Sequence, residues 1–355
     1  MPTISVDTFF ACSLMVLLVL SAMAAASKLL YPHISNAVDA TVAERYESVS
    51  KYLLLNDGTP SNWGQNYQVV PENFGLAKAG SDNPYELDID KVSRLNEENL
   101  YALSYAQIFT AFEMSDVSFR IEIEPIFEVA LNLTAVFEGA NETSYKFEIL
   151  TEKQGVPVQA ELRFYVVAED YLETSHAGVS DGRTYVNTTI SNDVNGPAIL
   201  VVFARSISNA KIVSFSAYPF AHNSTEPKSK STFSRLSPLS YKLNVSLVYL
   251  GTNLSDAYAL SFNYSATLTQ TANSSQSATY NIPHILDPSP AIVVITGWNS
   301  TSFFTEWTAY PQIPLQTGTN FASSATLSNV FAYTYLVTID SALYKCTVWL
   351  GGPRE

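Results

Sequence analysis

Cysteine is nearly absent from this 355-residue chain, which contains only Cys12 and Cys346. One lies inside an apolar run near the start and the other near the end, so a disulfide between them is geometrically implausible. The chain therefore lacks a disulfide framework. Its four histidines are isolated and lack the spacing of metal ligands. We expect no metal ion and no cofactor.

Charge is also scarce, at 15% of the residues against about 25% in ordinary soluble domains. The formal net charge is −14 and no basic patch is present, which argues against a nucleic-acid partner. The string Gly178-Val179-Ser180-Asp181-Gly182 matches the nucleophile elbow G-x-S-x-G. An elbow needs a helix after it, whereas the following residues predict a strand, so we expect a hairpin turn here. We therefore predict no catalytic site and no enzyme.

One long apolar run is present at residues 9–26, FFACSLMVLLVLSAMAAA. Eighteen helical residues span about 27 Å, most of the hydrocarbon core of a bilayer. The eight Phe, Leu and Val residues would favour insertion by roughly 2–5 kcal/mol in total. We expect these residues to cross the cell membrane once and the C-terminal region to be extracellular. The run is a cleaved secretory signal, an ordinary signal anchor or a pilin-type helix.

The apolar run continues into an amphipathic pattern. Hydrophobic residues recur at three- and four-residue steps at Leu29, Leu30, Ile34, Val38, Val42, Tyr46, Val49 and Leu53. This spacing predicts one continuous helix, which Pro32 would kink without ending. Its end is predicted at Asn56-Asp57-Gly58, shortly before Pro60. Such a helix would suit lateral packing of identical neighbours, or it would serve as a stalk.

A short polar stretch, Thr3-Ile4-Ser5-Val6-Asp7, stands directly before the apolar run. It resembles the Q-x-S-x-E start of archaeal class III signal-peptide proteins, the type IV pilin-like group. The resemblance implies that Thr3 takes the place of the mature N-terminal residue and that Asp7 takes the acidic position. It also implies a subunit contact, in which Asp7 pairs with the free amine of a neighbour inside the membrane. An unpaired charge there is costly.

Three motifs after the helix extend this resemblance. They are Gly58-Thr59-Pro60-Ser61-Asn62-Trp63, Phe74-Gly75-Leu76-Ala77 and Leu87-Asp88-Ile89-Asp90-Lys91-Val92. The ordered set is similar to a pattern that follows the anchor in an uncharacterised family of archaeal pilin-like proteins. The residues themselves predict a turn with a buried Trp63, a permissive backbone position at Gly75 and two short helices. Residues 58–116 should form a structural collar between the helix and the β-region.

From residue 117 onward the pattern is that of β-strands. Phe119 to Glu124 alternates with a period of two, as a half-buried strand does. Turn signals separate this strand from six further candidates, at 129–137, 145–150, 158–167, 184–190, 198–203 and 211–217. Seven short strands over about 100 residues favour an antiparallel sandwich.

A second run of strands follows residues 223–240, a stretch with two prolines and three basic residues that we interpret as a linker. The candidate strands are 242–249, 257–270, 278–282, 291–296, 303–309, 331–339 and 344–350. The predicted fold class is α+β, a long N-terminal helix followed by a mainly antiparallel β-sandwich ectodomain. The predicted parts are a transmembrane and stalk helix (1–57), a collar (58–116), a first β-sandwich-like domain (117–222), the linker and a second β-rich domain (241–355). One large sandwich is the alternative.

The clearest functional signal in the β-region is a set of N-glycosylation sequons. Nine of the fifteen asparagines beyond residue 131 begin N-x-Ser/Thr with a middle residue other than proline, and none of the eight before it does. Glycans would explain how a surface so poor in charge stays soluble. The nine are Asn132, Asn141, Asn187, Asn223, Asn244, Asn253, Asn263, Asn273 and Asn299.

Together these features predict an extracellular glycoprotein held at the cell surface by its first helix. The leading hypothesis is a pilin-like structural or adhesive protein whose partners are the membrane and identical or related subunits. The alternative is a monomeric membrane-anchored module that binds carbohydrate or protein. An ectoenzyme that hydrolyses its substrate is a third, weaker hypothesis.

Overall fold

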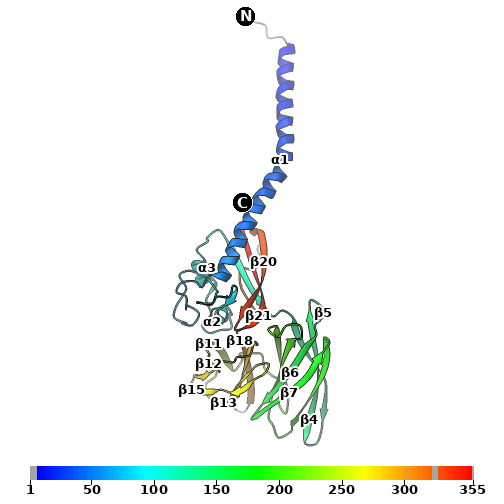
Figure 1. Cartoon of the computed structure of the whole chain (residues 1–355), viewed down its shortest axis with the longest axis vertical. Helices are drawn as coiled ribbons and strands as arrows, with labels where there is room; N and C mark the ends of the chain where they lie inside the picture. Colours follow the sequence, from blue (N-terminus) through cyan, green and yellow to red (C-terminus); the bar gives the residue numbers. More distant parts are fainter. Residues whose placement is uncertain (1–5, 301, 322–326, 354–355) are drawn as a thin grey trace.

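The computed structural model describes residues 6–300, 302–321 and 327–353, without the side chains of 6–12, 25, 29–40, 327–329 and 353. A long helix extends away from a body built mainly of antiparallel β-sheets (Figure 1). The coarse prediction of a β-sandwich fold behind an N-terminal helix is therefore confirmed.

Helix α1 (Val6–Leu55) is continuous over 50 residues. It bends between its upper and lower parts (Figure 1). It ends where the sequence predicts: the amide of Asn56 still donates to the carbonyl of Tyr52 at 2.9 Å, and Gly58, with φ +72°, turns the chain. Among the residues described, no helix combines the length and the apolar composition that a membrane crossing requires.

The body begins with a five-stranded sheet beside the lower end of α1. Its strand order is β1-β20-β21-β2-β19, and two short helices, α2 (Ile89–Ser93) and α3 (Tyr105–Phe112), lie with it. Its core contains Tyr46, Val49 and Leu53 of α1 and hydrophobic residues of the sheet. We call residues 42–124 and 313–353 the proximal unit. Its strands are β1 (Glu86–Leu87), β2 (Ser118–Glu124), β19 (Leu315–Gly318), β20 (Leu327–Ile339) and β21 (Ala342–Pro353).

The first sandwich follows β2 in the chain. Its outer sheet contains β3 (Glu128–Glu138), β4 (Glu142–Lys153), β5 (Val156–Pro157) and β8 (Arg183–Ser191). Its inner sheet has the order β10-β9-β6-β7, with β6 (Ala160–Ala168), β7 (Tyr171–Ser180), β9 (Ala198–Ser206) and β10 (Val213–Phe220). Phe147 of the outer sheet and Phe164 of the inner sheet belong to the same buried core.

The second sandwich has the same plan. Its outer sheet has the order β11-β12-β16-β15, with β11 (Ser234–Leu239), β12 (Lys242–Leu247), β15 (Thr269–Asn273) and β16 (Ser277–Asn281). Its inner sheet has the order β14-β13-β17-β18, with β13 (Thr252–Leu260), β14 (Ser265–Thr267), β17 (Ala291–Asn299) and β18 (Ser302–Tyr310). Leu243 and Val293 meet in the core between them.

The two inner sheets pack against each other, so the four sheets form one stack. In β9, Leu200 and Val202 face the first sandwich's own core, whereas Val201 and Phe203 share a core with β17 of the second sandwich. Because both faces of β9 and β17 are buried, the sequences of these strands are continuous apolar runs. Such runs are usual in parallel sheets with both faces covered. Here the second covering layer is another antiparallel sheet.

Several predicted boundaries differ from the structure. The strand at 117–123 and those at 331–339 and 344–350 belong to one proximal sheet, so the two sandwiches are an insertion between β2 and β19. The last strands of the expected second domain over 241–355 therefore belong to the proximal unit. The expected linker over 223–240 contains a strand, β11. Pairing between strands that lie more than 200 residues apart leaves no local pattern in the sequence.

Candidate functional site

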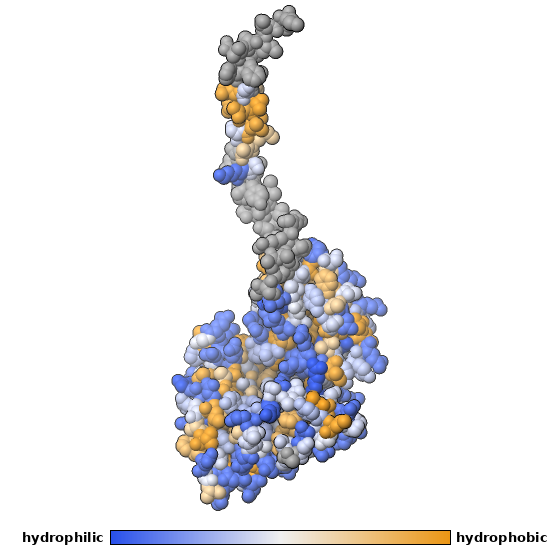
Figure 2. Space-filling view, turned by 180° about the vertical axis from the view of Figure 1, so that it is seen from behind, coloured by the Kyte–Doolittle hydropathy of each residue, from blue (hydrophilic) through white to orange (hydrophobic). Residues whose placement is uncertain are grey.

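The apolar part of α1 stands free of the body. Seven successive residues from Leu14 to Leu20 are each at least 50% exposed, and Met23 is 65% exposed. Seven successive residues cover every side of a helix, because each turn takes 3.6 residues. Figure 2 shows this apolar surface as an orange column above the body. The side chain of Asp7, the predicted subunit contact, lies outside those described.

The collar motifs cap the lower end of α1. The carbonyls of Leu53 and Asn56 accept hydrogen bonds from the amides of Leu76 and Ala77, both at 2.9 Å. These are carbonyls that a helix end leaves without a partner. Gly75 makes the close approach possible, because a Cβ there would lie 2.3 Å from the carbonyl oxygen of Asn56. The motif Gly75-Leu76-Ala77 thus serves to cap the C-terminal end of α1.

The tryptophan of the first motif anchors the same region. Trp63 is fully buried, and its indole N–H donates to the carbonyl of Gly75 at 3.1 Å. Its ring lies 5.9 Å from that of Phe74. The expected turn with a buried Trp63 matches this geometry.

Two cations are buried beneath this tryptophan. The ammonium of Lys91 donates to the carbonyls of Asp57 and Ala77, both at 2.7 Å, and Arg94 donates to four carbonyls between residues 63 and 69 and to that of Tyr101. Burial lowers the pKa of Lys91 and lowers that of Arg94 to about 10. Every one of these acceptors is a backbone carbonyl, so the cations tie loops together. The sequence identified Lys91 only through the resemblance and missed the role of Arg94.

Asp90 connects the collar to the second sandwich. Its carboxylate accepts from the amide of Ser240 and from the hydroxyl of Tyr310, both at 2.7 Å. Burial raises the pKa of this carboxyl group. Asp88, the neighbouring acid, instead caps α2 by accepting from the amides of Asp90 and Lys91 at 3.0 Å.

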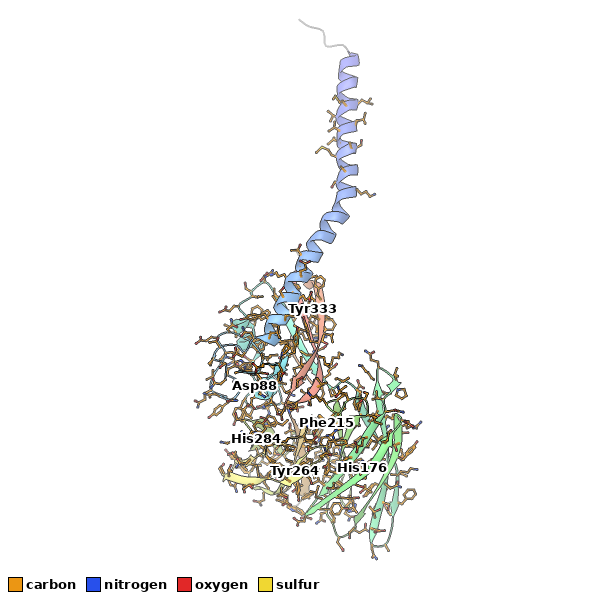
Figure 3. All side chains as sticks on the ribbon, in the orientation of Figure 1. Asp88, His176, Phe215, Tyr264, His284 and Tyr333 are labelled. Atoms are coloured by element: carbon orange, nitrogen blue, oxygen red, sulfur yellow. The ribbon has the colours of Figure 1, made fainter. Side chains whose placement is uncertain are left out.

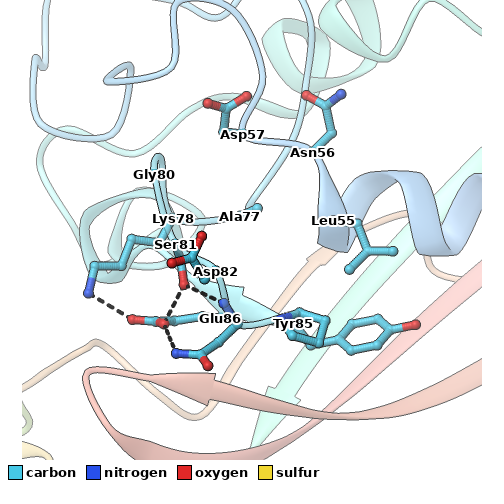
Figure 4. A pocket seen from close by; sticks show the side chains of 12 residues that line it. Leu55, Asn56, Asp57, Ala77, Lys78, Gly80, Ser81, Asp82, Tyr85 and Glu86 are labelled. Carbon is cyan, nitrogen blue, oxygen red and sulfur yellow. Dashed lines mark hydrogen bonds and ion pairs between the residues drawn. The ribbon is translucent and has the colours of Figure 1, made fainter.

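A polar hollow of about 410 Å³ lies beside the collar, between the end of α1 and the loop of residues 77–86 (Figure 4). Glu86 accepts from Lys78 at 2.7 Å, from Ser81 at 2.6 Å and from Asn83 at 3.0 Å. These bonds, above all the one from Lys78, lower the pKa of Glu86 to about 2. The side chains of Lys78, Ser81 and Asn83, which line the hollow, are thus engaged with Glu86, and no group of three metal-ligating residues occurs in the described part of the chain.

All nine sequon asparagines lie on the surface of the two sandwiches. Seven are exposed, and Asn244 and Asn299 are half-buried. The proximal unit contains none. Asn223 differs from the others because its amide nitrogen donates to the carbonyls of Asn192 at 2.8 Å and Val194 at 3.2 Å.

The described residues that we considered as catalytic or metal-binding candidates, and rejected on the basis of the sequence, do not come together in one site. Gly178 to Gly182 connects β7 to β8, and because these strands belong to different sheets the segment is not the predicted hairpin. His176 and His284 lie on different sandwiches (Figure 3). Cys346 is a free, fully buried thiol whose pKa burial raises to about 12.

Comparison with known proteins adds little to this geometry. The chain matches no family model and no curated protein. Among solved structures it is similar to HBP35 of Porphyromonas gingivalis, at 12% identity and a TM-score of 0.18, over 55% of this chain and 64% of that one. A structure of the two C2 domains of Extended-Synaptotagmin 2 gives 8% identity and a TM-score of 0.14, over 67% and 91%. Structural similarity at these TM-scores supports no conclusion about function.

Proposed function

We propose that this chain is a surface protein held in the cell membrane by residues 9–26, with its sandwiches outside the cell, and that it serves a structural or adhesive role of the pilin-like kind. The observation that carries the proposal is the column of exposed apolar side chains from Leu14 to Leu20. A helix that is apolar on every side suits a bilayer or a bundle of similar helices, and water is the least favourable surrounding for it.

The distribution of sequons supports an extracellular body. All nine are accessible or partly accessible, although the sandwiches bury most of their hydrophobic residues. Glycans at these positions would cover both sandwiches and leave the proximal unit bare. Mass spectrometry of tryptic glycopeptides from the native host tests this. Unmodified asparagines at all nine positions would contradict the extracellular assignment.

The membrane anchor is tested by fractionation of cells that express the whole chain. We expect the wild type to stay in the membrane pellet after carbonate washing. The Leu17→Arg variant should be released in part, because arginine at the centre of a membrane helix costs about 2.5–3.5 kcal/mol. Leu250→Arg is the matched control, since Leu250 is 74% exposed on the β12–β13 loop. Release of the wild type by carbonate would overturn the anchor.

The resemblance of Thr3–Asp7 to the start of pilin-like proteins favours assembly into filaments over the alternative, a monomeric binding module. If Asp7 pairs with a neighbour's amine, Asp7→Ala should leave the protein in the membrane but prevent assembly. Sizing of the detergent-extracted wild type separates the two functions: a monomer favours the binding module, and a large assembly that Asp7→Ala dissolves favours the filament. Mass spectrometry of the N-terminus determines whether cleavage before Thr3 occurs.

A further inference from the structure

We propose that the free edge of strand β20 is a docking site for an extended, uncharged polypeptide segment, which adds to the proximal sheet as a further strand. The proposal concerns the body of the protein and holds whether or not residues 9–26 enter a membrane. It rests on the hydrogen-bonding groups of the edge, on the chemistry of its surroundings and on a contrast with the other edges of the molecule.

The edge of β20 is long and open. On one side β20 pairs with β21. On the other, the only strand that pairs with it among the described residues is the two-residue strand β1, at Thr338 and Ile339. The amide of Thr338 donates to the carbonyl of Tyr85 at 2.9 Å, so its backbone groups point toward this open edge. Successive residues of a strand point their backbone groups to opposite edges. Ala332, Thr334 and Leu336 therefore present three N–H and three C=O groups outward.

Edges of this kind are normally blocked, because they can pair with any available strand. The sequence of β20, LSNVFAYTYLVTI, contains no charged residue and no proline, which are usual means of blocking an edge. The pairing of β20 with β21 shifts its register between Ser328 and Phe331 and is regular from Phe331 to Ile339, the part that we propose as the docking site. The edge is thus long, regular and unblocked.

The edges of the two sandwiches, in contrast to that of β20, are guarded. In the first sandwich, β3 and β8 carry the sequons at Asn132 and Asn187, β10 contains Pro219 and the pairing of β7 contains a bulge. In the second, β11 contains Pro238, β15 carries the sequon at Asn273 and β14 has only three residues. The remaining sandwich edge, β18, carries the charged residue Glu306, whose carboxylate accepts from the amides of Ser231 and Phe233 at 2.7 and 2.9 Å.

The surroundings of the edge define the chemistry of its occupant. On the side of α1 the edge is flanked by Phe331, Tyr333 and Tyr335, and Tyr333 lies beside the lower part of the helix (Figure 3), with its hydroxyl on the carbonyl of Ala43 at 2.6 Å. On the other side Leu336 is 57% exposed. The charged neighbours of these tyrosines, Glu47 and Lys51, form an ion pair at 2.6 Å.

A charged segment would lose hydration at this edge without gaining a counter-ion, whereas a neutral segment of alternating β-branched or aromatic residues would pair its backbone and bury its side chains. The strand would continue the row that β1 begins. The occupant we propose is therefore a neutral extended segment of a partner protein at the surface.

A synthetic probe tests the site directly. The probe is a fluorescein-labelled neutral peptide of eight alternating threonines and valines, added to the purified full chain in detergent micelles. Fluorescence anisotropy measures binding, and residue-resolved hydrogen exchange locates it. We expect exchange to slow at the amides of Ala332, Thr334 and Leu336. The amides of Tyr333 and Tyr335 already face β21 and should not change.

Two variants and one control peptide make the test specific. Ala332→Pro removes an outward N–H without touching the bonds to β21 and should weaken binding about tenfold. Leu336→Lys adds a charge at an exposed position and should also weaken it. Thr271→Pro, at the bulge of the guarded strand β15, is the matched control and should leave binding unchanged. The same peptide N-methylated at alternate residues keeps its apolar character and should not bind.

Three results would overturn the proposal: equal binding by Ala332→Pro and wild type, protection without the alternating pattern, or no binding at all. Protection of Ala332, Thr334 and Leu336 in the absence of peptide, lost on dilution, would also contradict it. That result would show that a second copy of the chain occupies the edge.

Discussion

At the scale of single residues, the collar buries ionisable groups and compensates each in a different way. Lys91 and Arg94 gain backbone carbonyls, whereas Asp90 gains one amide and two hydroxyls. Burying a charge is costly unless hydrogen bonds replace its hydration. The hydrogen bonds to Asp90 replace the lost hydration only in part. Burial therefore still raises the pKa of this carboxyl group.

This raised pKa predicts a pH dependence. The folded state holds a proton on Asp90 at pH values where the unfolded chain, with an ordinary value of 3.8, has lost it. The contribution of Asp90 to the free energy of unfolding therefore falls as pH rises from about 4 through the folded pKa. Asp90→Asn keeps an oxygen for Ser240 and Tyr310 but cannot ionise.

We expect Asp90→Asn to lose less stability than wild type between pH 4 and pH 7 in urea titrations. Glu86→Gln is a control of opposite sign in a lower range: the lowered pKa of Glu86 stabilises the fold above 4.5, and this contribution is lost as pH falls from 4.5 to about 2. Parallel curves for Asp90→Asn and wild type across this range would contradict the prediction.

At the scale of elements, α1 serves two purposes along one helix. Its first part exposes apolar residues on every side, whereas Leu53 and Leu54 near its end are at most 1% exposed within the core of the proximal unit. The lower part of α1 is therefore packed in the body of the protein. The sequence had left open whether this helix serves only as a stalk. The amphipathic pattern located this face at Tyr46, Val49 and Leu53, because the spacing of three and four residues depends only on the geometry of the helix. The predicted side chains from Leu29 to Val38 lie outside those described.

We expect Leu53→Ala to lower the free energy of unfolding by about 2–5 kcal/mol, since it empties a fully enclosed site. Leu55→Ala, on the same turn but 47% exposed, should change it by no more than about 0.5 kcal/mol. Urea denaturation of the detergent-extracted chain, followed by tryptophan fluorescence, gives both values. Similar losses for the two variants would mean that the end of α1 is not packed in the core.

At the scale of the whole molecule, the two sandwiches share a core. Tyr165 of the first donates to the carbonyl of Ser261 in the second at 2.8 Å, and Arg205 pairs with Asp287 at 2.5 Å across the same boundary. The linker between them is thus no flexible joint. The two sandwiches follow each other in the chain as expected, but they pack as one body.

Because of this shared core we expect the two sandwiches to unfold together. Phe203→Ala, at a fully buried position facing the second sandwich, should cost about 3–5 kcal/mol and speed hydrogen exchange in β4 and β17 alike. Phe137→Ala, at a residue 62% exposed in β3, is the control and should change neither. Faster exchange in β4 with none in β17 would mean that the sandwiches unfold independently.

The sequence by itself determined the features that depend on neighbouring residues: the length and end of α1, its apolar first part, the buried Trp63, most of the strands and the surface asparagines. These follow from helix spacing, alternation and turn chemistry, all of which act over a few residues. The tertiary structure alone decided which strands share a sheet, that the two sandwiches are inserted into the proximal unit, and that β20 keeps an open edge. These depend on pairing between β2 and β21, more than 200 residues apart, and on burial of both faces of β9 and β17.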